Sequence, residues 1–182
     1  MMERIGQVGL IPDGKGFIPD LIDWATRSTV YHVIIAISET ECIGAEPNGA
    51  TIRPLSRFPN AIWSQFPLTA IQARDTAAWA AAREGRPYNW IDDGLIGVQC
   101  ISGIIFPKFI TDRYDNDESY ECAQLADAAL TNGAKITVFD DNRPPGTVYP
   151  GSFEKLYRQN GWWTRPDLIP RSPRGTPVLA RL

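Results

Sequence analysis

Two residues of this sequence have the chemistry needed to cleave an acyl bond together. Cys122 lies in the segment DESYECAQLADAAL, and His32 is the single histidine of the chain. A thiol becomes a strong nucleophile when an adjacent imidazole accepts its proton, and the thiolate then attacks a carbonyl carbon. Because the chain has one histidine, only His32 could be the base of such a Cys–His pair.

The residues around Cys122 have the apolar spacing of a helix that begins near Tyr120. The backbone N–H groups of a first helical turn have no helical partner, and the helix dipole is positive there. A thiolate at Cys122 would be stabilised, and the same N–H groups could bind the oxyanion of a tetrahedral intermediate. The spacing also fits a packing cysteine, because free cysteine is among the most buried residue types. The apolar face of this helix comprises Cys122, Leu125, Ala126, Ala129 and Leu130.

His32 interrupts an apolar, β-branched stretch, TVYHVIIAIS, which predicts a strand over residues 29–38. One interpretation is a hydrogen-bonded core histidine, and the other is a general base that a third polar group orients. Glu46, in the following segment CIGAEP, is the best candidate for that group, although a carboxylate at a strand end can also simply face solvent. Cys42 and Cys100 lack a helix-start environment and are interpreted as packing residues.

Composition predicts an ordinary globular domain. The chain has 182 residues, 43% hydrophobic and 21% charged, with a formal net charge of −3, a balance that does not favour nucleic-acid or membrane-surface binding. We expect one domain over residues 1–163 and a Pro/Arg-rich tail over residues 164–182 that could bind a protein partner. The apolar run from Gly94 to Ile110 is too short and too polar for a transmembrane helix.

The cysteine and histidine content argues against metal and cofactor sites. The three cysteines form no CxxC pair and the chain has one histidine, which does not suit the ligand sets of structural zinc sites. No metal and no cofactor are therefore predicted. The start of the sequence lacks the pattern of a signal peptide, which leads us to expect a cytoplasmic protein.

Local patterns predict an α+β fold in which a small antiparallel sheet packs against helices. The helix that carries Cys122 should pack on this sheet so that Cys122 meets His32. Strands are expected over residues 4–11 and 29–38, on both sides of the turn PNG, and over residues 135–139; helices are expected from Ile18, over 69–85 with Thr69 as N-cap, over 89–106, over 120–133 and from Pro150.

Five segments, in their order along the chain, resemble a known family. They are YHVIIAIS, IGAEPNGATIRPL, AAREGRPYNW, SYECAQLADAAL and FDDNRPPGTVYPGSFEKL. Together they resemble the circularly permuted papain-like cysteine hydrolases of the NlpC superfamily, the YiiX-like group related to lecithin retinol acyltransferase. In permuted members the histidine precedes the cysteine, as His32 precedes Cys122 here. The last segment resembles phage-encoded relatives, and the resemblance spans about residues 28–160.

The resemblance implies a permuted papain-like fold in which Cys122 is the nucleophile and His32 is the base. The family's acidic position falls on Gly44, so Glu46, two residues later and on the same face of the strand, is the expected third catalytic residue. Where relatives have a serine after the cysteine, this chain has Ala123.

The resemblance also implies where a substrate would be held and what it would be. Gln124 matches a family glutamine, and Tyr88 could line an acyl pocket together with segment 91–106, which could equally be a core helix. The implied activity is that of a thiol protease or amidase that forms an acyl-enzyme, with cell-wall peptides as a natural substrate and lipid acyl bonds as the alternative. The departures at Gly44 and Ala123 support a further alternative, a catalytically silent binding or virion component. A phage-encoded protein would be found in the host cytoplasm or the virion.

Overall fold

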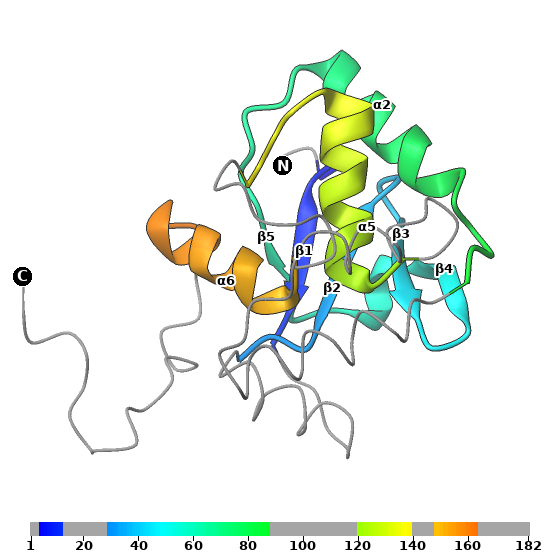
Figure 1. The fold of residues 1–182 in the computed structure, drawn as a ribbon, viewed down its shortest axis with the longest axis horizontal. Coiled ribbons are helices and arrows are strands. Elements are labelled where there is room, and N and C mark those ends of the chain that lie inside the picture. Colours follow the sequence, from blue (N-terminus) through cyan, green and yellow to red (C-terminus); the bar gives the residue numbers. More distant parts are fainter. Residues whose placement is uncertain (1–3, 13–28, 88–119, 140–147, 164–182) are drawn as a thin grey trace, which may run out of the picture.

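The computed structural model describes residues 4–12, 29–87, 120–139 and 148–163 of the chain. Its centre is a five-stranded antiparallel sheet with the strand order β4-β3-β2-β1-β5, and helices pack against it (Figure 1). This arrangement confirms the predicted α+β class with an antiparallel sheet. The strands are β1 (Val8–Ile11), β2 (His32–Ala36), β3 (Glu41–Glu46), β4 (Gly49–Pro54) and β5 (Ile62–Trp63); the helices are η1 (Leu55–Arg57), α2 (Ala70–Ala81), α5 (Cys122–Ala129), η2 (Leu130–Ala134) and α6 (Pro150–Gln159).

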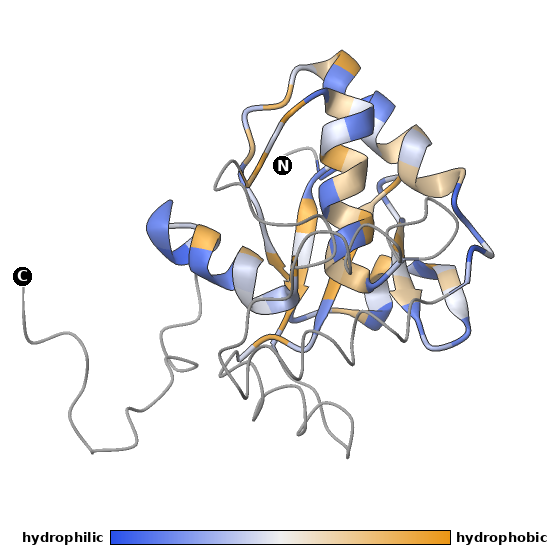
Figure 2. Cartoon of the chain, in the orientation of Figure 1, coloured by the Kyte–Doolittle hydropathy of each residue, from blue (hydrophilic) through white to orange (hydrophobic). Residues whose placement is uncertain are grey.

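Strand β2 forms the middle of the sheet, as its nearly continuous apolar sequence indicates. Its residues Val33 to Ala36 are all buried, and the strand is predominantly hydrophobic (Figure 2). The antiparallel register pairs Ile11 of β1 with His32 and pairs Ala36 with Cys42 of β3. Paired residues of an antiparallel sheet project their side chains to the same face, so this register decides which side chains can meet.

The two faces of the sheet have separate hydrophobic cores. One core contains Val33 and Ile35 of β2 together with Leu125 of α5, and Figure 1 shows α5 lying across this part of the sheet. The other core contains Ile34 with Ile11 and Cys42, and the side chains packed around it come from the neighbouring loops and strands: Tyr31, Leu55, Phe58, Ala61 and Trp63. Alternate residues of β2 therefore face α5 and the opposite core.

Helix α2 begins where the sequence predicts. Thr69 is its N-cap, and its hydroxyl accepts a hydrogen bond from the N–H of Gln72, whose own side chain accepts from the N–H of Thr69. The helix then packs closely on the end of the α5–η2 segment, because a Cβ atom added to Gly133 would lie 2.6 Å from the Cα of Thr76. A glycine at position 133 therefore allows the two backbones to touch.

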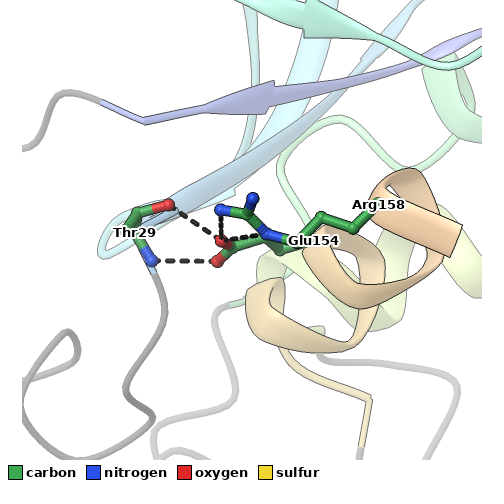
Figure 3. Close-up of polar contacts among 3 residues, drawn as sticks. All are labelled: Thr29, Glu154 and Arg158. Atoms are coloured by element: carbon green, nitrogen blue, oxygen red, sulfur yellow. Dashed lines mark hydrogen bonds and ion pairs between the residues drawn. The ribbon is translucent and has the colours of Figure 1, made fainter. Parts of the chain in front are cut away.

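Helix α6 is fixed to the sheet and to the chain that enters β2. The hydroxyl of Tyr157 donates a hydrogen bond of 2.6 Å to the carbonyl of Val8 in β1. Glu154 accepts hydrogen bonds from both the N–H and the hydroxyl of Thr29, and it also binds Arg158 one turn later (Figure 3). Thr29 lies three positions before His32, so α6 helps to position the start of β2.

Some predicted elements differ from the structure. The strand predicted over residues 135–139 is wrong: these residues follow η2 without forming a strand, and Lys135 has a left-handed backbone with φ of 60°. The short strand β5 was not predicted, because two residues give no periodic pattern. The helices predicted from Ile18 and over residues 89–106 lie outside the described residues. None of the described helices is both long enough and apolar enough to cross a membrane.

Candidate active site

Cys122 is the first residue of α5, so it lies in the first turn as predicted, but its thiol has an unexpected polar neighbour. Sγ of Cys122 donates a hydrogen bond of 2.9 Å to Oε1 of Glu121, the N-cap residue. Both residues are buried: Cys122 is 4% exposed and Glu121 is 3% exposed. The start of α5 therefore holds a thiol and a carboxylate in direct contact away from solvent.

The second oxygen of the Glu121 carboxylate caps the helix. Oε2 accepts hydrogen bonds from the N–H of Ala123 at 3.0 Å and of Gln124 at 3.4 Å. The Gln124 side chain completes a capping box by accepting from the N–H of Glu121. Two of the N–H groups that were expected to bind an oxyanion are thus already bound by a carboxylate of the same chain, which a substrate oxyanion would have to displace.

Glu121 is the residue of this site that sequence reasoning missed. A signal was present, because an acidic residue followed three positions later by glutamine is compatible with a capping box. The sequence predicts a helix that starts near Tyr120, and the N–H groups of its first turn were expected to be available to a substrate. The contact between Cys122 and Glu121 depends on side-chain rotamers, which the spacing of residues does not specify.

His32 lies on the face of the sheet opposite α5. It pairs with Ile11, which belongs to the core remote from α5, and its ring lies 6.1 Å from the ring of Phe58, measured between centroids. The ring also fills the space above Gly44, since a Cβ atom at that position would be 2.8 Å from Nε2 of His32. These neighbours all belong to the side of the sheet away from the Cys122 thiol.

Glu46 lies near His32, as the sequence predicts. The register of β2 with β3, continued toward the start of β2, places Glu46 opposite His32 and on the same face. Burial lowers the pKa of His32 to about 4, while the Glu46 carboxylate opposes and the Arg57 guanidinium reinforces this shift. The imidazole is therefore neutral at pH 7, the form that a general base requires.

The Glu46 carboxylate is held mainly by arginine. Arg53 of β4 forms two hydrogen bonds with it, Nε to Oε1 at 3.0 Å and Nη2 to Oε2 at 2.6 Å. These bonds are the main cause of the lowered pKa of Glu46. The carboxylate is thus an acceptor for Arg53, and its effect on His32 is to oppose the lowering of the His32 pKa.

The structure brings His32 and Glu46 together but does not bring them to Cys122. The sheet stands between the thiol and the imidazole, because Cys122 belongs to the core under α5 and His32 packs with Ile34 and Phe58 on the other side. The expected meeting of Cys122 with His32 across the seam is therefore not found. The physical reason is the register of β2, which turns Val33 rather than His32 toward α5.

The remaining predicted residues fall into two groups. Gln124 is half-buried and contributes to the cap of α5, so its side chain has a structural partner in Glu121. Cys42 is buried as predicted for a packing residue, and burial raises the pKa of its thiol to about 12. Tyr88 and Cys100 lie outside the described residues.

Comparisons with known proteins provide no assignment. No family model matches the chain, and neither the curated proteins nor the solved structures contain a significant match. Within the described residues, no three His, Cys, Asp or Glu side chains are placed to hold a metal ion together. Any function must therefore be argued from the sequence pattern and from the geometry of Cys122, His32 and their neighbours.

Proposed function

We propose that this chain is a cysteine-dependent hydrolase in which Cys122 is the nucleophile. The observation that carries the proposal is the buried contact of 2.9 Å between the Cys122 thiol and the Glu121 carboxylate at the first residue of α5. Burying a carboxylate is costly; the N–H groups of the first turn of α5 offset part of that cost at Oε2, and the Cys122 thiol lies against the other oxygen. Functional sites often contain titratable groups that are buried against a specific partner.

The proposed reaction is acyl transfer through a thioester. The sulfur of Cys122 attacks the carbonyl carbon of the substrate, the leaving amine or alcohol departs with a proton, and water then hydrolyses the acyl-enzyme. The resemblance of the segments around His32 and Cys122 to permuted papain-like hydrolases favours an amide or peptide substrate, with cell-wall peptides as the first class to test and lipid acyl esters as the second.

Acylation by a simple activated ester tests this proposal. Wild-type protein is mixed with p-nitrophenyl acetate, and we expect a burst of nitrophenol close to one equivalent with an acetyl group on Cys122 in the mass spectrum. Cys122→Ala should abolish the burst. Cys42→Ala is the matched control, because it removes a second buried thiol from the opposite core and should leave the burst intact. A burst that survives Cys122→Ala would contradict the proposal.

A second candidate is a catalytically silent binding component on the same fold. It is favoured by the 4% exposure of Cys122 and by the separation of His32 from the thiol. On this hypothesis the native protein shows no burst with p-nitrophenyl acetate, and iodoacetamide modifies Cys122 only after unfolding. Its partner would be a protein, and the C-terminal tail from residue 164 that could bind it lies outside the described residues.

A further inference from the structure

We propose that Glu121, rather than His32, accepts the proton of Cys122 during acyl transfer. This inference rests on the proposed hydrolase function and assigns to that reaction a residue that the resemblance to papain-like enzymes does not indicate. It is carried by two geometric facts, the contact of Sγ with Oε1 and the position of His32 on the other face of the sheet.

The Glu121 carboxylate is oriented as a general base should be. A nucleophile needs its base within hydrogen-bonding distance, and the base in turn needs a group that fixes its direction. Oε1 of Glu121 lies 2.9 Å from Sγ, while the N–H groups of Ala123 and Gln124 hold Oε2. Oε1 is thus directed at the Cys122 thiol, the geometry that a general base requires.

The proton transfer is balanced within the pair and the substrate. As the bond from Sγ to the carbonyl carbon forms, the S–H bond breaks and its proton passes to Oε1 of Glu121. When the tetrahedral intermediate collapses, the bond to the leaving nitrogen or oxygen breaks and that atom takes the proton from Glu121. In deacylation the carboxylate accepts a proton from water and returns it to the departing sulfur, so the enzyme ends as it began.

The competing base would have to act through the sheet. The His32 ring lies against Gly44 and Phe58, in the core that does not include α5. A general base has to reach the proton that it abstracts, directly or through one water. Glu121 meets this requirement, because its Oε1 lies 2.9 Å from the Cys122 sulfur.

The test compares Glu121→Gln with His32→Ala and with Glu46→Gln. Glutamine is isosteric with glutamate and keeps an oxygen for the N–H groups of the first turn. Two quantities are measured for each protein: the pH midpoint of Cys122 alkylation by iodoacetamide, followed by mass spectrometry, and the rate of Cys122 acetylation by p-nitrophenyl acetate. Circular dichroism checks that each variant is folded, and Glu46→Gln is the matched control for loss of a carboxylate.

We expect Glu121→Gln to lower the alkylation midpoint by about one pH unit or more, because a neighbouring negative charge disfavours the thiolate. We also expect acetylation to slow by about 10²-fold, the usual lower range for loss of a general base. A thiol that ionises more easily should by itself react faster. If acetylation is nevertheless slower in Glu121→Gln, the variant has lost the group that accepts the proton. His32→Ala and Glu46→Gln should change neither quantity.

Three results would overturn the inference. The first is an alkylation midpoint that Glu121→Gln leaves unchanged, since the contact would then be absent in solution. The second is acetylation that falls in His32→Ala and persists in Glu121→Gln. The third is a wild-type protein that shows no burst at all, which refutes the proposed hydrolase function as a whole. A wild-type burst that Glu121→Gln leaves intact refutes only the role of Glu121.

Discussion

At the scale of single residues, Gly44 determines where the His32 ring lies. A Cβ atom at position 44 would approach Nε2 of His32 to 2.8 Å and Cγ2 of Ile34 to 3.1 Å. The ring therefore occupies space that any other residue at position 44 would fill. Glycine at position 44 and the placement of the His32 ring are therefore coupled.

We predict that Gly44→Ala destabilises the fold by about 1–2 kcal/mol, the range for adding a methyl group to a packed site. The expected cause is the contact with the His32 ring, so the cost should be smaller when His32 is already alanine. Urea unfolding of both single variants and the double variant measures the coupling as a double-mutant cycle. An equal cost in both backgrounds would show that Ile34, rather than His32, limits the site.

The buried hydroxyl of Thr76 leads to a second prediction at this scale. Its hydroxyl is fully buried and has no hydrogen-bond partner among the described residues. Leaving a buried hydroxyl unpaired costs about 1–3 kcal/mol. Thr76→Val, which is nearly isosteric, is therefore expected to leave the free energy of unfolding unchanged or to raise it by about 1 kcal/mol. Thermal unfolding monitored by circular dichroism measures it, and a clear loss of stability would indicate that the hydroxyl is paired.

At the scale of elements, α6 and β2 are joined by one buried carboxylate. Glu154 is 5% exposed, and its Oε1 accepts from the hydroxyl of Thr29 at 2.9 Å and from Nη2 of Arg158 at 2.6 Å (Figure 3). The Arg158 guanidinium also lies 4.1 Å from the centre of the Trp163 ring. The network connects the last described helix to the residue that leads into β2, two elements far apart in sequence.

Breaking this connection should be costly. Glu154→Gln removes the charge that binds Arg158 and weakens the hydrogen bonds from Thr29, so we expect a loss of about 2 kcal/mol in the free energy of unfolding. Asp75→Asn is the control, since Asp75 forms an exposed ion pair with Arg74 and such pairs contribute little. Urea titration followed by tryptophan fluorescence compares the two variants. Equal effects would refute the special role of the Glu154 network.

At the scale of the whole molecule, the sheet divides the titratable groups into two sets. The side under α5 carries the Cys122–Glu121 pair, and the other side carries His32 with Glu46 and Arg53. Acidification should reduce the stability of the fold through His32, which belongs to the second set. Burial lowers the pKa of His32 to about 4, below its value of about 6.5 in an unfolded chain.

The stability of the fold should therefore fall as the pH falls from about 6.5 toward about 4. In this window the unfolded state binds a proton at His32 and the folded state does not, so protonation favours unfolding. The residue as a whole is half-buried, and solvent screening limits the expected loss to about 1–2 kcal/mol. Urea unfolding at about pH 7 and about pH 5 measures it, because these values lie on either side of the unfolded pKa.

His32→Gln is the control for this pH dependence. It should reduce the difference in stability between the two pH values, and what remains reports the carboxylates, including Glu46. Because the chain has a single histidine, the titration of the His32 ring can also be followed directly by NMR without assignment. A His32 titration near its ordinary midpoint would contradict the prediction.

Much of the fold could be predicted from local pattern. The β-branched run around Val33, the turn after Glu46 and the cap at Thr69 each carry a strong local signal, and the structure has β2, the β3–β4 hairpin and α2 at those places. Segment 135–139 was misassigned, because its alternation resembles a strand but it has no place in the ladder. Local preference is overruled when no neighbouring strand edge supplies hydrogen bonds.

The sequence by itself determined the α+β class, the place of Cys122 in the first turn of its helix and the shared face of Glu46 and Gly44. Only the tertiary structure decided which face of the sheet α5 covers. Alternation along β2 separates Val33 and Ile35 from His32 and Ile34, but both sets contain large apolar residues, so the pattern cannot show which set meets the helix. The partner of Cys122 was decided in the same way, because a hydrogen bond between neighbouring side chains depends on rotamers that the folded core selects.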